Sequence, residues 1–132
     1  MAKMEDKKKI LVVDDEADIL EIMRARLKAN GYDVVTAVNG KDGLEQFAKE
    51  KPDAVLLDVM MPQIDGIDVL RRIRQENAFV PVFMITAFSN EERFKLANTL
   101  NASGFILKTS DLQAEIGNIT ASIKIAEKYK KK

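Results

Sequence analysis

The stretch Ile10-Leu11-Val12-Val13-Asp14-Asp15-Glu16 joins a run of branched apolar residues to three consecutive acids. A short, continuous apolar run is typical of a strand that is buried on both faces, as in a parallel sheet. Acids placed directly after such a strand lie at its carboxyl end, where doubly wound sheets bind their ligands. The stretch therefore predicts both the type of sheet and the edge at which a site would form.

Similar apolar runs recur along the chain, at residues 34–35, 54–57, 80–85 and 105–107. Between the runs lie segments whose apolar residues have helical spacing. These stripes are Ile19, Leu20, Met23 and Leu27; Leu44, Phe47 and Ala48; Ile67, Leu70, Ile73 and Arg74; Phe94, Ala97 and Leu100; and Leu112, Ile116, Ile119, Ile123 and Ala126. Strand and helix thus alternate five times, which predicts an α/β domain with right-handed crossovers.

Turn and capping residues agree with this division. Asn30-Gly31 is expected to end the first helix, Asn39-Gly40 to form a turn before the second, and Lys51-Pro52-Asp53 to end the second. Ser89 with Glu92, and Ser110 with Gln113, resemble capping boxes for the last two helices. We therefore expect a flavodoxin-like (βα)5 fold, with a doubly wound five-stranded parallel sheet in the strand order 2-1-3-4-5.

The composition limits the chemistry that the chain can perform. Its 132 residues fit a single domain, with a core of about 8–126 and charged ends at 1–7 and 127–132. The chain has no cysteine, which excludes disulfides and thiolate zinc sites, and no histidine, the usual general base. Carboxylates, lysines and hydroxyls remain, and such a set favours oxygen-seeking cations such as Mg²⁺.

The charge and hydropathy pattern favours a cytoplasmic protein with protein partners. The formal net charge is zero, and the sequence lacks the basic stripe that is typical of nucleic-acid binders. No apolar run is long enough to span a membrane, and the start lacks a signal-peptide pattern. The lysines at 128 and 130–132 are interpreted as a solvated helix end, with a severed linker to an output domain as the alternative.

Polar residues follow several of the predicted strands at the same edge of the sheet. Asp14 and Asp15 follow the first strand and Asp58 the third, while Thr86 and Lys108 end the fourth and fifth. Each acid taken singly could be a helix cap or a turn residue. Three carboxylates that lie together repel each other unless cations intervene, so the set predicts a divalent cation beside Lys108.

These segments resemble the receiver domains of two-component response regulators, of the chemotaxis-type single-domain kind, over residues 8–125. The resemblance is carried by Asp14-Asp15-Glu16, by Asp58-Val59-Met60-Met61-Pro62 with Asp65-Gly66, by Met84-Ile85-Thr86-Ala87, and by Phe105-Ile106-Leu107-Lys108. All four motifs occur in the family's order, each at the end of a predicted strand.

The resemblance implies a role for each of these residues. Asp58 would be the phosphoacceptor, assisted by Lys108 and Thr86. Mg²⁺, with Mn²⁺ as an alternative, would be held by Asp14, Asp15, Asp58 and the backbone carbonyl of Met60. Thr86 and Phe105 would form the switch; Phe105 stands where many relatives carry tyrosine, and it cannot donate a hydrogen bond.

The resemblance also implies partners. Because the chain lacks histidine, the phosphoryl group must come from a sensor histidine kinase, a histidine phosphotransfer protein or a small phosphodonor. The surface of the fourth helix, fifth strand and fifth helix would bind a downstream protein. The domain would then be a signalling module rather than an enzyme, without nucleic-acid or membrane partners.

Three other functions compete with this interpretation. A pseudo-receiver would bind partners without being phosphorylated, but the complete set of Asp14, Asp15, Asp58, Thr86 and Lys108 argues against this function. A phosphatase of the haloacid-dehalogenase kind needs a second Asp where this chain has Met60. A flavodoxin-like cofactor binder needs a phosphate-binding loop after the first strand, where this chain has acids.

Two departures from the family pattern affect the site. Thr109 replaces the usual proline after the lysine, so the Lys108-Thr109 peptide is expected to be either a strained cis bond or, preferably, a trans bond with a shifted loop. Met60 and Phe88 lie two residues after Asp58 and Thr86. The resemblance implies that these two positions border the path of the water that hydrolyses the acyl phosphate. We therefore hypothesise a slowly decaying phosphorylated form.

Overall fold

The computed structural model describes residues 8–86, 91–107 and 121, and within them one parallel sheet of five strands. The strands are β1 (Lys9–Val13), β2 (Asp33–Ala37), β3 (Ala54–Asp58), β4 (Val82–Thr86) and β5 (Gly104–Leu107). The helices are α1 (Ala17–Ala29), α2 (Gly40–Glu50), α3 (Gly66–Glu76) and α4 (Glu91–Thr99). The strand order β2-β1-β3-β4-β5 confirms the predicted flavodoxin-like fold. The helix expected over 112–126, apart from residue 121, and the capping residues Ser89 and Ser110 lie outside the described residues.

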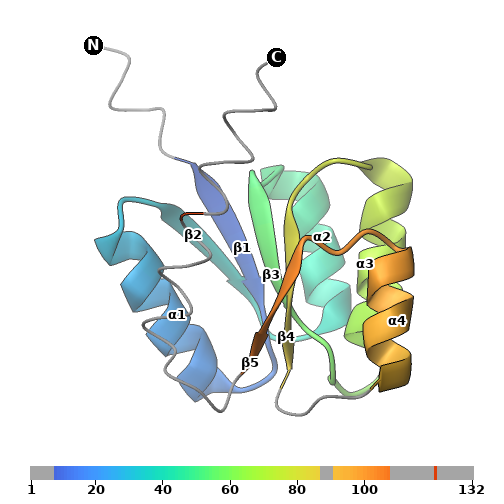
Figure 1. Ribbon diagram of the computed structural model, residues 1–132. Coiled ribbons are helices and arrows are strands. Elements are labelled where there is room, and N and C mark those ends of the chain that lie inside the picture. Colours follow the sequence, from blue (N-terminus) through green and yellow to red (C-terminus); the bar gives the residue numbers. More distant parts are fainter. Residues whose placement is uncertain (1–7, 87–90, 108–120, 122–132) are drawn as a thin grey trace.

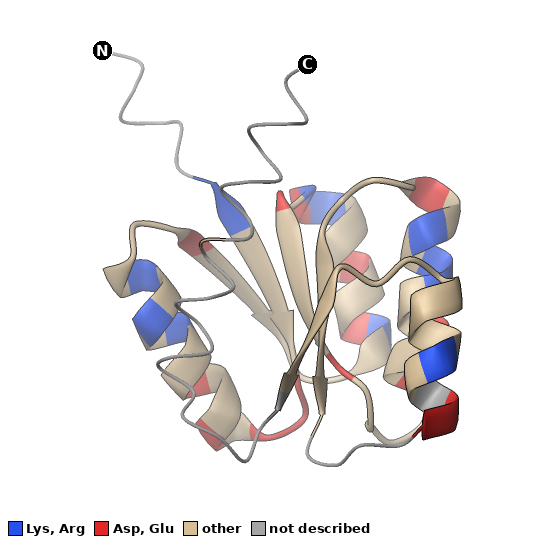
Figure 2. Ribbon diagram, viewed as in Figure 1, with Lys and Arg blue, Asp and Glu red and all other residues tan. Residues whose placement is uncertain are grey.

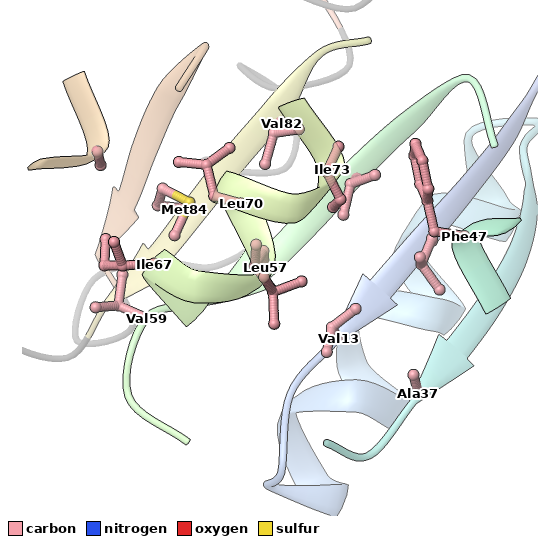
Figure 3. Packing of buried hydrophobic residues seen from close by; sticks show 14 of the residues in the cluster. Val13, Ala37, Phe47, Leu57, Val59, Ile67, Leu70, Ile73, Val82 and Met84 are labelled. Atoms are coloured by element: carbon pink, nitrogen blue, oxygen red, sulfur yellow. The ribbon is translucent and has the colours of Figure 1, made fainter. Parts of the chain in front are cut away.

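The sheet is covered on both faces. In Figure 1, α1 lies on one side of the sheet and α2, α3 and α4 lie on the other. Every residue of β3 is buried, as a strand covered on both faces requires. Leu56 belongs to the cluster beneath α1, whereas Leu57 belongs to the cluster shared with α2 and α3. Figure 3 shows Leu57 and Met84 of the sheet beneath Leu70 of α3 in this second cluster.

The helix ends largely follow the expected capping residues. Gly31, after the last turn of α1, has the positive φ of 91° that a glycine at this position tolerates. Asn39 is the N-cap of α2, and its side chain accepts a hydrogen bond from the backbone N–H of Asp42 at 2.8 Å. The expected turn at Asn39-Gly40 is therefore a helix start, since Gly40 already belongs to α2.

The strand predicted over 80–85 begins later than expected, at Val82. Pro81 has no N–H to donate to the sheet. The Val80 N–H is taken by the side chain of Asn77 at 2.9 Å, and the Val80 carbonyl accepts from Arg74 at 2.7 Å. Val80 is thus buried but tied to the end of α3, and the strand extends instead to Thr86.

The helical stripes are confirmed in α1 and α3 but are partly wrong in α2 and α4. Ala48 is exposed, and Gly43 takes its place on the buried face of α2. A Cβ on Gly43 would approach the side chain of Val13 to 3.0 Å, so α2 packs closely on β1 there. In α4, Ala97 is fully buried whereas Phe94 is 43% exposed.

Replacement of Lys51 by glycine should stabilise the protein. Lys51 ends α2 in the left-handed region, with φ 49° and ψ 61°. A side chain in this region costs about 1–2 kcal/mol, of which the greater chain entropy of glycine offsets a part. We expect Lys51→Gly to raise the free energy of unfolding by roughly 0.5–1 kcal/mol in urea denaturation. Lys51→Ala keeps a Cβ and is the matched control; a gain of equal size in both variants would contradict the backbone explanation.

Candidate functional site

Two neighbouring strands end in acids at one edge of the sheet. β1 pairs with β3 in the register Val13↔Leu57, so Asp14 follows beside Asp58, the last residue of β3. The Asp14 N–H continues the ladder with β2 by donating to the carbonyl of Ala37 at 3.1 Å. Figure 2 shows the acidic segments after β1 and at the end of β3 at the same edge of the sheet.

The three predicted acids meet at this edge. Asp14, Asp15 and Asp58 each place one carboxylate oxygen within 4.8 Å of the others. Asp14 is fully buried and Asp58 is 2% exposed, while Asp15 is open to solvent. Burying two ionised carboxylates beside a third costs free energy unless a cation compensates for their charge. A buried pair with one open neighbour is therefore a donor set that fits a hard divalent cation with remaining water ligands.

Local backbone contacts orient two of these carboxylates. Oδ1 of Asp14 accepts from the N–H of Glu16 at 2.8 Å, and Oδ1 of Asp58 accepts from the N–H of Met60 at 3.3 Å. Each acid thereby fixes the loop that follows its own strand. The helix-cap alternative for Asp15 is excluded, because Glu16 occupies the N-cap position of α1 and no side-chain hydrogen bond caps it.

Thr86 and Phe105 lie on adjacent strands near this edge. Thr86 is buried at the end of β4 and is paired with Leu107, and Phe105 is paired with Met84. Because side chains alternate along a strand, Thr86 and Phe105 are on the same face of the sheet. The half-buried ring of Phe105 stacks on Phe94 of α4, with centroids 4.0 Å apart and an interplanar angle of 26°.

The remaining predicted site residues are placed only in part. Met60 follows Asp58 by two residues and is 49% exposed beside the acids. Lys108, Thr109 and Phe88 lie outside the described residues, so the geometry of the Lys108-Thr109 peptide stays a prediction.

The family model described as the response regulator receiver domain matches residues 10–119. The chain belongs to the response regulator receiver family. It is therefore a signalling domain rather than an enzyme, and it carries a cluster of three acids at its strand ends.

Curated relatives share this receiver region. The chain is 43% identical over 101 residues to the alkaline phosphatase synthesis transcriptional regulatory protein PhoP of Bacillus subtilis (strain 168), covering 76% of this chain and 42% of that protein. It is 41% identical over 116 residues to the probable transcriptional regulator ycf27 of Pyropia yezoensis, covering 86% and 47%. The receiver thus spans about half the length of the curated relatives it matches.

Solved structures agree on the fold. A response regulator receiver domain protein from Clostridium thermocellum superposes with a TM-score of 0.83 at 30% identity, covering 94% of this chain and 97% of that one. A CheY-like receiver from Methanospirillum hungatei JF-1 superposes with a TM-score of 0.88 at 24% identity, covering 94% and 99%.

These comparisons show that the chain is a receiver domain, but they do not show which class of response regulator it belongs to. The single-domain chemotaxis type is not established, because the curated relatives are named as transcriptional regulators of about twice this length. For the same reason, the expected absence of a nucleic-acid partner stays a prediction. Within the part of the chain that the structure describes, no helix has the length and apolar character needed to cross a membrane.

One contact of the receiver escaped the sequence interpretation. In the sequence, Gly66 stands out only as part of the family motif Asp65-Gly66. In the structure, its N–H donates to the carbonyl of Val59 at 2.9 Å, which brings the start of α3 against the loop that follows Asp58. The Asp65-Gly66 pair is the feature of the sequence that could have pointed to this contact. The contact between Gly66 and Val59 depends, however, on how α3 packs on β3, which the sequence pattern does not show.

Proposed function

We propose that the receiver accepts a phosphoryl group on Asp58 in a Mg²⁺-dependent transfer from a phosphohistidine of a partner protein. The observation that carries this proposal is the cluster of Asp14, Asp15 and Asp58. A sensor histidine kinase or a histidine phosphotransfer protein would be the donor, because the chain contains no histidine of its own. The proposal concerns a single receiver domain with a core of about 8–126.

The transfer would proceed at the buried end of β3. An Asp58 carboxylate oxygen attacks phosphorus, and the bond from phosphorus to the imidazole nitrogen of the donor breaks. The bonding pair stays on that nitrogen, which takes up a proton from solvent if the imidazole leaves in its anionic form. The product is an acyl phosphate on Asp58 and a free histidine on the partner.

The cation site would be formed by Asp14, Asp15, Asp58 and the backbone carbonyl of Met60. Mg²⁺, with Mn²⁺ as an alternative, supplies positive charge opposite the phosphoryl oxygens when it is bound. Lys108 would supply a second positive charge at the same edge. Asp14 and Asp15 would thus serve the reaction by holding the cation beside Asp58.

Thr86 and Phe105 would transmit the modification. The Thr86 hydroxyl would donate a hydrogen bond to a phosphoryl oxygen, and the space it leaves would admit the Phe105 ring. Phe105 stacks on Phe94 of α4, so an inward turn of its ring would alter a contact with that helix. We propose that the surface of α4, β5 and the predicted fifth helix binds a downstream protein in this way.

Incubation with acetyl phosphate tests the proposal. With Mg²⁺ present, intact-mass analysis should show one added phosphoryl group per chain, and a chelator should prevent the addition. A folded protein that gains no adduct from acetyl phosphate, carbamoyl phosphate or a phosphorylated histidine kinase would favour the pseudo-receiver instead.

Asp14→Asn should separate metal binding from folding. Asparagine keeps the oxygen that accepts from Glu16 but removes one of the clustered charges. We expect Mg²⁺ to bind roughly 10–100-fold more weakly by calorimetric titration. The metal-free variant should be roughly 1–3 kcal/mol more stable, the Coulomb energy of two carboxylates ~5 Å apart at an effective dielectric constant of ~20–80.

Asp33→Asn is the matched control for this variant, since Asp33 is exposed at the opposite end of the sheet. Asp33→Asn should leave the Mg²⁺ affinity unchanged, and it should leave unchanged the increase in the free energy of unfolding that bound Mg²⁺ gives the wild type. Unchanged Mg²⁺ affinity in Asp14→Asn would remove Asp14 from the cation site.

Met60→Asn should shorten the lifetime of the acyl phosphate. The half-exposed Met60 side chain lies two residues after Asp58 and cannot hydrogen-bond an attacking water. One such hydrogen bond, of about 0.5–1.5 kcal/mol, corresponds to roughly a 2–10-fold faster decay. Decay is followed in Mg²⁺ after removal of the donor, with Met60→Leu as an apolar control. Equal decay rates in the three proteins would reject the hypothesis of a slowly decaying form.

A further inference from the structure

The first residue of α3 lies against the backbone of the proposed phosphoacceptor. A Cβ placed on Gly66 would be 2.0 Å from the carbonyl oxygen of Asp58 and 2.9 Å from its carbonyl carbon. It would also be 2.9 Å from the Cα of Val59. Real Cβ atoms essentially never approach other atoms closer than 3.0 Å, so any side chain here would force the backbone apart.

α3 is held in place at its start by a cap and by buried side chains. The side chain of Asp65 caps the helix by accepting from the N–H of Ile67 at 2.7 Å. Ile67, Val69, Leu70 and Ile73 are buried against the sheet. In the loop at 59–65, Val59 and Met61 are buried, whereas Met60, Pro62 and Gln63 are exposed. A side chain at Gly66 would therefore have to shift the segment 58–60 and the start of α3 relative to each other.

The backbone of Val59 joins this segment to two other elements. Its carbonyl accepts from the N–H of Gly66 at 2.9 Å, and its N–H donates to the carbonyl of Ile85 at 2.9 Å. Ile85 directly precedes Thr86 on β4. The Met60 N–H, one residue further on, contacts the Asp58 carboxylate at 3.3 Å. A displacement at Gly66 would consequently reach the nucleophile, the Met60 carbonyl and the strand of the switch threonine.

We propose that Gly66 is a positioning residue of the phosphorylation site. Its missing side chain lets the start of α3 hold the backbone of Val59 against β4, which fixes the Asp58 carboxylate and the Met60 carbonyl for the cation. Gly66 touches neither the cation nor the phosphoryl group. This inference rests on the proposed function, because it concerns the geometry in which Asp58 is phosphorylated.

Gly66→Ala tests the inference against a matched crowding variant, Gly104→Ala. A Cβ on Gly104 would meet the Phe83 ring at 3.1 Å, at the end of β5 remote from the acids. In protein shown by circular dichroism to be folded, Gly66→Ala should bind Mg²⁺ roughly 10–100-fold more weakly and gain the phosphoryl adduct correspondingly more slowly. Gly104→Ala should bind Mg²⁺ and accept the phosphoryl group as the wild type does.

The outcomes separate this inference from the proposed function. Wild-type Mg²⁺ affinity in folded Gly66→Ala would overturn the inference alone, because the receiver would still be phosphorylated. A wild type that neither binds Mg²⁺ nor gains an adduct would overturn the proposed function and, with it, the inference.

A measurement on the wild type decides the case if Gly66→Ala fails to fold. Saturation with Mg²⁺ should slow hydrogen exchange at the Val59 and Gly66 amides, which join the loop to β4 and α3. The Gly31 amide, which donates to Lys28 after α1, serves as the internal control and should exchange at an unchanged rate. Unchanged exchange at Val59 and Gly66 in the metal-loaded protein would overturn the inference.

Discussion

Asp58→Asn is expected to abolish the Mg²⁺-dependent phosphoryl adduct. An amide lacks the anionic oxygen that attacks phosphorus, so no acyl phosphate forms. Asparagine has nearly the same size as aspartate, and its oxygen can still accept from the Met60 N–H in this buried position. The variant should therefore fold, and intact-mass analysis after incubation with acetyl phosphate and Mg²⁺ should show only the unmodified chain.

Asp68→Asn is the control for this experiment. Asp68 lies on α3, exposed to solvent, and pairs with Arg71 at 2.6 Å. Its loss removes the same charge without touching the acidic cluster, so this variant should gain the adduct at the wild-type rate. A folded Asp58→Asn protein that gains the same adduct would show that another residue is the acceptor.

Leu56→Ala and Leu57→Ala should each destabilise the protein by about 2–5 kcal/mol. Both side chains are fully buried, but they point to opposite faces of β3. Leu56 lies in the cluster beneath α1 and Leu57 in the cluster beneath α2 and α3. Truncation leaves a cavity on either face, so two adjacent residues should show similarly large losses in urea denaturation.

Ile22→Ala provides the comparison for these two variants. Ile22 is 42% exposed on α1, so its truncation should cost less than about 1 kcal/mol. A loss confined to one of the two leucines would contradict a sheet covered on both faces.

Much of the fold was predictable because the strands have a simple pattern. Continuous apolar runs such as residues 10–13 and 54–57 indicate strands buried on both faces, and their alternation with helical stripes indicates the parallel order. The errors arose where tertiary contacts decide. Asn77 takes the Val80 N–H from the sheet, and Gly43 rather than Ala48 packs on β1. Neither choice is visible in hydrophobic periodicity.

The acidic cluster was predictable for a different reason. Parallel strands place their carboxyl ends at one edge, and β1 and β3 are neighbours in the doubly wound order, so Asp14, Asp15 and Asp58 had to meet. The sequence did not reveal which acids are buried. It also did not reveal the contact of Gly66 with Asp58, because that distance depends on how closely α3 packs against β3.

The roles of Thr86, Lys108 and Phe105 rest on the family resemblance. The structure places Thr86 and Phe105 on one face of adjacent strands, which is compatible with a concerted movement. Lys108, Thr109 and Phe88 lie beyond the described residues, so their contributions remain predictions.

The most direct measurement of the central claim locates the phosphoryl group on the chain. Borohydride reduces an acyl phosphate to an alcohol, and peptide mass analysis then identifies the altered residue. After phosphorylation with acetyl phosphate and Mg²⁺, the expected result is homoserine at position 58 and unchanged aspartate at positions 14 and 15. Reduction at Asp14 or Asp15 instead, or an adduct that resists the hydride, would contradict phosphorylation at Asp58.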